Sequence, residues 1–93
     1  MPTKENEHLK EELQLLAEIG IDSSLIVWND DFNTFDWVIE SLIKVCKHTT
    51  IQAQQCTFLI HFTGKAVVKN GNIEILETMR LQLIERNLTA TIE

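Results

Sequence analysis

The spacing of apolar residues changes repeatedly along these 93 residues, and this alternation constrains the fold more than any other feature. Short runs rich in β-branched residues, or alternating apolar residues with threonine, predict strands at residues 24–28, 65–69 and 88–92. Apolar residues that recur every three or four positions predict helices at residues 34–47, 50–62 and from 72 onward. The order β-α-α-β-α-β predicts the α+β fold class: a two-layer domain in which a three-stranded antiparallel sheet packs against three helices.

Capping and turn residues predict where these elements begin and end. Asn33 and Asp36 have the spacing of a capping box ahead of the first of these helices. Thr49 and Gln52 form a capping box of the usual residue types ahead of the second. The Asn-Gly pair at residues 70–71 predicts a turn that ends the second strand.

Residues 1–23 are more polar than the rest of the chain and are expected to form an N-terminal extension, partly helical or flexible, ahead of a core domain at 24–93. A narrow apolar stripe with helical spacing supports a helix in the extension. The stripe consists of Leu9, Leu13, Leu16 and Ile19. Gly20 offers a stop for this helix. Simple packing of the helix on the domain is an equally good interpretation.

Charge and cysteine content exclude some classes of partner and compartment. The chain has 14 acidic and 8 basic residues, for a net charge of −6, and is therefore a poor electrostatic match for nucleic acid. Its longest uncharged run is rich in Thr and Gln, so no contact with a membrane is expected. Cys46 and Cys56 lack CxxC spacing, and no export signal precedes them, which predicts reduced thiols in a cytoplasmic protein.

Two groups of polar residues are candidates for chemistry. Asn29, Asp30 and Asp31 follow the first predicted strand, where turn formation and capping are the simplest interpretation. A metal site or an acid-base pair would need further ligands or a nucleophile, and the spacing of the remaining residues supplies neither. His61 lies in an apolar stretch, which favours a structural role. The residue pattern alone therefore predicts no catalytic residue, metal or cofactor.

Three separate segments carry a family resemblance. They are NDDFNTFDWV at residues 29–38, HFTGKA at residues 61–66 and TATIE at residues 89–93. The first resembles the Asn-Asp-Asp-aromatic segment of the ClpS adaptors, the second resembles their His-aromatic-x-Gly-Lys-Ala run, and the third resembles their terminal strand. The order and separation of the segments also agree, and the resemblance covers about residues 24–93.

The resemblance implies a binding function and no enzymatic activity. ClpS adaptors bind substrates that begin with a bulky hydrophobic residue (Leu, Phe, Tyr or Trp) and deliver them to the N-terminal domain of a Clp-family AAA+ unfoldase. The residues implied to bind the free α-amine are Asn29, Asp30, Asp31 and His61. Those implied to line the hydrophobic pocket are Asn33, Phe35, Val38, Thr57, Ile60 and Leu88. Those implied to dock on the unfoldase are Glu74 and Met79.

The sequence departs from the family pattern at three of these positions. Many members carry methionine at the positions of Phe35 and Thr57, so the pocket is expected to survive with a different ranking of first residues. Met79 stands where lysine is common, which leaves the identity of the Clp ATPase open. Two alternatives remain: an interaction domain with the fold of the ribosomal stalk C-terminal domain, and a small metal-dependent hydrolase using Asp30, Asp31 and His61.

Overall fold

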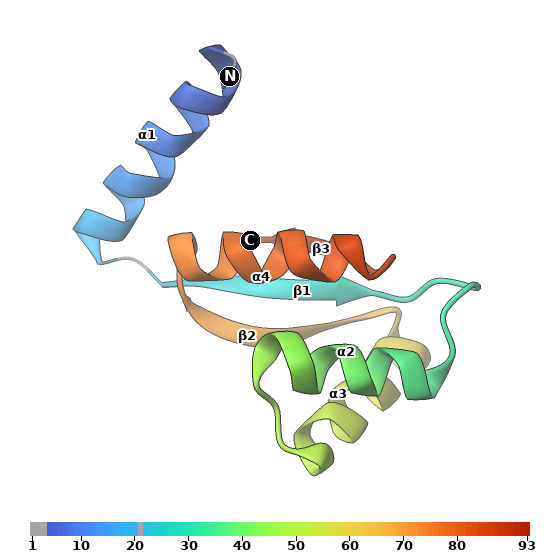
Figure 1. Cartoon of the computed structure of the whole chain (residues 1–93). Helices are drawn as coiled ribbons and strands as arrows, with labels where there is room; N and C mark the ends of the chain where they lie inside the picture. The colour runs from blue at the N-terminus through green and yellow to red at the C-terminus, as the bar shows by residue number, and fades with distance from the viewer. Residues whose placement is uncertain (1–3, 21) are drawn as a thin grey trace.

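The computed structural model describes residues 4–20 and 22–93, which form a sheet layer and a helix layer (Figure 1). The sheet is antiparallel, with strand order β2-β1-β3. Its strands are β1 (Asp22–Trp28), β2 (Lys65–Asn72) and β3 (Thr89–Ile92). The helices are α1 (Lys4–Ile19), α2 (Phe35–Cys46), α3 (Thr50–Thr63) and α4 (Ile73–Glu85). The α+β fold class is thus confirmed, with the predicted order of elements from β1 to β3.

The central strand β1 holds the two layers together. Its residues Leu25, Ile26 and Val27 are all buried. Leu25 and Val27 point into a single apolar core that also contains Leu42 of α2 and Leu83 of α4. Residues two apart share one face of a strand, which explains why Leu25 and Val27 belong to the same core. Cys46 is also buried in this core, and Cys56 packs against it half-buried.

The capping boxes are predicted correctly for α3 and incorrectly for α2. Thr49 and Gln52 cap each other reciprocally at the start of α3. At the start of α2, the cap is Thr34, whose side chain accepts a hydrogen bond from the backbone N–H of Trp37 at 3.2 Å. Asn33 is not the cap, and its side-chain amide instead donates to Asp30 in the loop before the helix and to Asn87 after α4.

The second strand runs longer than the sequence suggests. The Asn-Gly pair at residues 70–71 lies inside β2, so the turn predicted there is wrong. The reason lies in β1, which begins at Asp22 and supplies pairing partners for the last residues of β2. Asn70 pairs with Ser24, and their side chains form a hydrogen bond of 2.6 Å. Cross-strand pairing therefore overrides the local turn preference.

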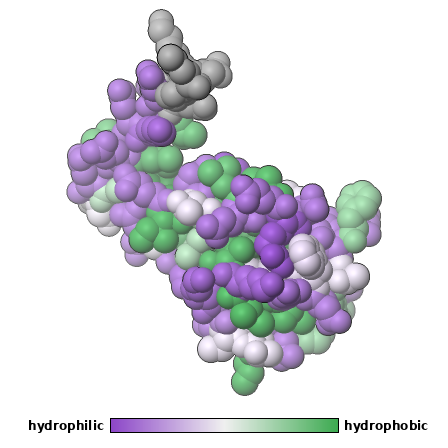
Figure 2. Space-filling view, viewed as in Figure 1, coloured by the Kyte–Doolittle hydropathy of each residue, from purple (hydrophilic) through white to green (hydrophobic). Residues whose placement is uncertain are grey.

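Helix α1 contacts α4, and in Figure 1 it projects away from the rest of the molecule. Leu13 is half-buried, whereas Leu9 remains largely exposed, and the side chains of Leu16 and Ile19 lie outside the described residues. Most of the face visible in Figure 2 is hydrophilic, with smaller hydrophobic patches between. None of the helices described over residues 4–20 and 22–93 is long and apolar enough to cross a membrane.

The cap at Thr34 gives a test of how α2 begins. Thr34→Ala removes the oxygen that accepts the Trp37 N–H, and we expect it to lower the free energy of unfolding by about 1 kcal/mol. Thr34→Ser keeps that oxygen and should stay close to the parent chain. Urea denaturation of the three proteins measures the difference. Equal stability of the Ala and Ser variants would show that Thr34 does not act as the cap.

Candidate functional site

A single pocket lies where β1 ends, α2 begins and α3 ends. Its cavity volume is about 310 Å³. It is lined by all of the residues proposed for the α-amine and the hydrophobic side chain: Asn29, Asp30, Asp31, Asn33, Phe35, Val38, Thr57, Ile60, His61 and Leu88. Val27 and Trp28 also line it, although sequence reasoning did not include them. Their position directly before Asn29 is the signal that could have identified them.

The loop after β1 is ordered by the carboxylate of Asp30. One of its oxygens accepts hydrogen bonds from the backbone N–H groups of Phe32 and Asn33, both at 2.8 Å. The other accepts from the side-chain amide of Asn33 at 2.7 Å. Burial raises the pKa of Asp30, but the hydrogen bonds from Asn33 and Phe32 outweigh it and hold the pKa below its ordinary value. Asp30 thus serves first as the anchor of its own loop.

Asn33 ties this loop to the segment that leads into β3. Its side-chain amide donates to Asp30 and also to the backbone carbonyl of Asn87, at 2.9 Å. Asn87 adopts a left-handed conformation with φ of 69°, which asparagine tolerates better than most residues. Leu88 follows directly and is buried at the pocket wall. The amide of Asn33 therefore helps to place Leu88 at the same pocket as the start of α2.

A backbone contact brings the end of β1 to the end of α3. The N–H of Asn29 donates to the carbonyl of Gly64 at 2.8 Å. Gly64 caps α3 with φ of 95°, a conformation that glycine adopts at little cost. His61 lies in α3, about one turn before Gly64. The hydrogen bond from Asn29 to Gly64 therefore brings the side chains of Asn29 and His61 to the same pocket. Residues far apart in sequence thus meet at the rim.

The pocket floor is apolar and well packed. Val38, Ile60 and Leu88 are all buried, and so is Thr57. The Thr57 hydroxyl donates to the carbonyl of Ala53 at 2.7 Å, so its proton is already used within α3. Phe35 is 39% exposed, and its ring meets the imidazole of His61 edge-on, with centroids 4.9 Å apart. Phe35 therefore forms part of the rim as well as of the wall.

Negative charge gathers on one side of this rim. Asp31 is exposed, Asp30 is half-buried, and neither is engaged in an ion pair among the described residues. Carboxylate oxygens beside an amide oxygen can accept hydrogen bonds from a cation with several N–H groups. No group of three or more His, Cys, Asp or Glu among the described residues could hold a metal ion. The site thus combines an anionic rim with an apolar floor.

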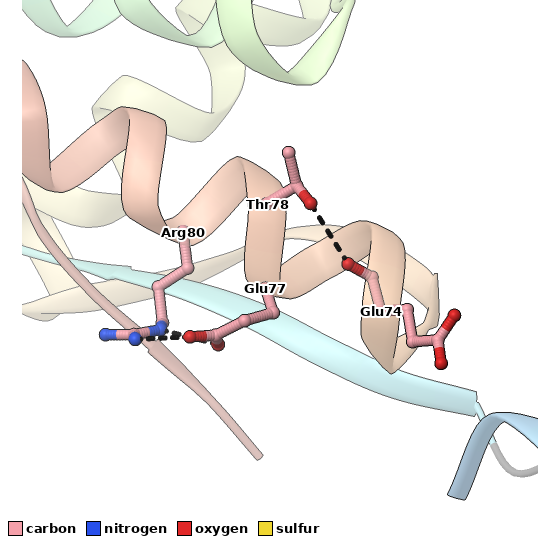
Figure 3. A network of polar contacts seen from close by, with 4 residues as sticks. All are labelled: Glu74, Glu77, Thr78 and Arg80. Atoms are coloured by element: carbon pink, nitrogen blue, oxygen red, sulfur yellow. Dashed lines mark hydrogen bonds and ion pairs between the residues drawn. The ribbon is translucent and has the colours of Figure 1, made fainter. Parts of the chain in front are cut away.

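The two residues predicted for docking lie on α4, away from the pocket. Glu74 is exposed in the first turn of α4, where its backbone carbonyl accepts from the Thr78 hydroxyl (Figure 3). Met79, in contrast, packs partly buried against the core. Arg80 beside it is held by Glu77 through a hydrogen bond of 2.8 Å from Nε. The structure therefore does not bring Glu74 and Met79 together as one exposed pair.

Comparisons with known proteins agree with this architecture. The family model described as ATP-dependent Clp protease adaptor protein ClpS matches residues 22–91. The ATP-dependent Clp protease adapter protein ClpS of Thermosynechococcus vestitus is 39% identical over 66 residues, 70% of this chain and 70% of that protein. The protein of the same name from Nostoc sp. is 41% identical over 66 residues, 70% of this chain and 68% of that protein.

A solved structure also shares the fold. The structure of Agrobacterium tumefaciens ClpS2 bound to L-phenylalaninamide has a TM-score of 0.74 at 22% sequence identity. The similarity covers 77% of this chain and 94% of that chain.

The lowered pKa of Asp30 predicts a pH dependence of stability. A carboxyl whose folded pKa is depressed contributes stability above its unfolded pKa of about 4, and that stability is lost as the pH falls through the folded value. Unfolding free energies at pH 7 and pH 3 should therefore differ more for the parent chain than for Asp30→Asn, which cannot ionise. Asp36→Asn, on the exposed start of α2, is the control. The same pH dependence in the parent and Asp30→Asn would contradict the anchoring role.

Proposed function

The chain belongs to the ClpS family of adaptors of the ATP-dependent Clp protease, and from this premise we propose that its pocket binds the first residue of substrate proteins. The residue bound is a bulky hydrophobic one, namely Leu, Phe, Tyr or Trp, and it carries a free α-amine. The observation that carries the proposal is the joining of an anionic rim and an apolar floor in one cavity of about 310 Å³. Such a first residue has both matching features, a cationic amine and an apolar side chain.

In this proposal the amine lies at the rim, among Asn29, Asp31 and His61. An ammonium has three N–H donors, and these side chains offer an amide oxygen, a carboxylate and an imidazole nitrogen. His61 accepts only in its neutral form, so its unprotonated nitrogen faces the ligand. Asp30 contributes mainly through negative potential and through the loop that it holds, because both of its oxygens already accept hydrogen bonds.

The side chain of the first residue then fills the space above the apolar floor of the pocket. Burial of a Leu or Phe side chain stabilises a complex by about 1.5–3 kcal/mol. The walls are provided by Val38, Ile60 and Leu88, which are already buried and ordered by the core. Preorganised walls of this kind add little ordering cost on binding. The bound phenylalaninamide of Agrobacterium tumefaciens ClpS2 has the same two features, a free amine and an aromatic side chain.

Selectivity for a free α-amine follows from the hydrogen-bond acceptors at the rim, which need a donor from the ligand. An acetylated or internal residue has no ammonium, so acceptors at the rim would be desolvated without a donor, at about 1–3 kcal/mol for each. A ribosomal-stalk-like interaction domain would share the fold but would not need this rim. The hydrolase alternative lacks a metal-binding group among the described residues. A first-residue receptor is therefore the function that the site supports best.

We further propose that the adaptor docks on the N-terminal domain of a Clp AAA+ unfoldase through the face of α4 that presents Glu74. This carboxylate is exposed and lies in the first turn of α4, away from the pocket, so substrate and unfoldase can be held at once. Met79 would act from beneath, by packing that part of α4 on the core. The proposed compartment is the cytoplasm, where thiols such as those of Cys46 and Cys56 stay reduced.

The amine requirement can be measured by fluorescence anisotropy with a Phe-initiated peptide and its N-acetylated twin. We expect acetylation to weaken binding by at least about tenfold, because charge-assisted hydrogen bonds are lost. Asp31→Asn should weaken binding of the free peptide by about tenfold, whereas Asp36→Asn, outside the pocket, should not. Equal binding of the two peptides would rule out a receptor for the free α-amine.

The presence of Thr57, where many family members have methionine, predicts the relative affinities of the pocket for different first residues. Thr57→Met adds volume to a pocket whose wall already contains the Phe35 ring. We therefore expect affinity for Trp- and Phe-initiated peptides to fall by about tenfold, and for Leu-initiated peptides to fall less. Thr50→Met, at the exposed start of α3, is the matched control. An equal change in affinity for all three first residues would contradict a role of Thr57 in shaping the pocket.

A further inference from the structure

Two exposed aromatic rings lie on α3 beside the pocket. Phe58 is 53% exposed and Phe62 is 74% exposed. They lie one helical turn apart, and their rings are nearly parallel, with centroids 6.0 Å apart and an interplanar angle of 6°. Neither belongs to the buried core. We call this pair the aromatic shelf. Contiguous exposed apolar side chains of this kind are candidates for a binding surface.

The aromatic shelf is continuous with the pocket rim through two ring contacts. Phe35 meets Phe58 edge-on, with centroids 5.6 Å apart and an interplanar angle of 73°. His61 meets Phe62 edge-on, with centroids 5.0 Å apart and an angle of 81°. Phe35 and His61 themselves line the pocket. A peptide chain that leaves the pocket over these two residues would therefore contact the aromatic shelf next.

The distances match the spacing of a peptide. An extended chain advances about 3.3 Å for each residue, so the two residues after the first span about 7 Å. The centroids of Phe62 and Phe58 lie 5.0 and 5.6 Å from the rim residues that they contact. Residues two and three of a peptide anchored by its amine are thus the first that can reach the shelf.

We propose that the aromatic shelf is a second subsite, which binds an apolar or aromatic side chain at residue two or three of the peptide whose first residue fills the pocket. This inference rests on the proposed function, since the pocket sets where the peptide begins. Aromatic rings stack on one another and pack against aliphatic groups, and they gain from both when water is removed. Phe58 and Phe62 therefore extend the selectivity of the site beyond the first residue.

The test compares Phe-initiated peptides that have Gly, Leu or Trp at residue two, and a second set varied at residue three, by fluorescence anisotropy. We expect Leu or Trp to bind about three- to tenfold more tightly than Gly in at least one of the two positions. Phe62→Ala should abolish most of this preference and leave binding of the Gly peptides within about twofold. Phe62→Leu should retain part of it. Ile51→Ala, which removes an exposed apolar side chain elsewhere on α3, should leave the preference intact.

Two outcomes would overturn the inference. One is a parent chain that requires the free amine but binds Gly, Leu and Trp peptides equally in both positions, which would leave the first-residue pocket standing and remove the subsite. The other is a concentration-dependent dimer of the free chain that Phe62→Ala abolishes, seen by light scattering, which would assign the shelf to self-association. Loss of the amine requirement itself would instead contradict the proposed function, so the two failures are distinguishable.

Discussion

Pairing of β1 on both of its edges is the constraint on which the rest of the structure depends. β1 lies between β2 and β3, and its buried residues Leu25 and Val27 form the centre of the core. Because both edges of β1 are paired, the position of its C-terminal end is fixed. The pocket forms at that end. The loop after Trp28 therefore lies at the start of α2 and the end of α3, where its side chains line one pocket together with residues of β1, α2, α3 and Leu88.

A few hydrogen bonds hold this loop in place at the rim of the pocket. Asp30 anchors the loop, Asn33 joins it to Asn87, and the backbone of Asn29 joins it to Gly64. With the loop tied to Asn87 after α4 and to Gly64 at the end of α3, the side chains of Asn29 and Asp31 remain exposed. The carboxylate used for structure and the carboxylate proposed for binding are adjacent, and the difference between them lies in the partners that the fold gives to Asp30.

Much of the fold follows from local pattern, and the exceptions have physical causes. Thr49 and Gln52 cap α3 as their residue types predict. Asn33 does not cap α2: Thr34 accepts the Trp37 N–H, while the Asn33 side-chain amide donates to the carbonyl of Asn87, a distant partner that only the tertiary structure supplies. The residues that line the pocket could be named because the family resemblance singles them out, whereas helical periodicity by itself does not distinguish Phe35 and Ile60 from core residues. Phe58 carried no motif, and Phe62 stood in the HFTGKA segment without an assigned role, so the pairing of their rings was visible only in the structure.

The central claim is that one pocket binds both the α-amine and the side chain of the first residue of a substrate. The most direct measurement is a titration of the isotope-labelled chain with L-phenylalaninamide, followed by amide chemical shifts. The account predicts saturable shifts concentrated at Asn29, Asp31, Thr57 and His61, with no such response to the N-acetylated compound. Shifts confined to other parts of the molecule, or the same shifts with both compounds, would contradict it.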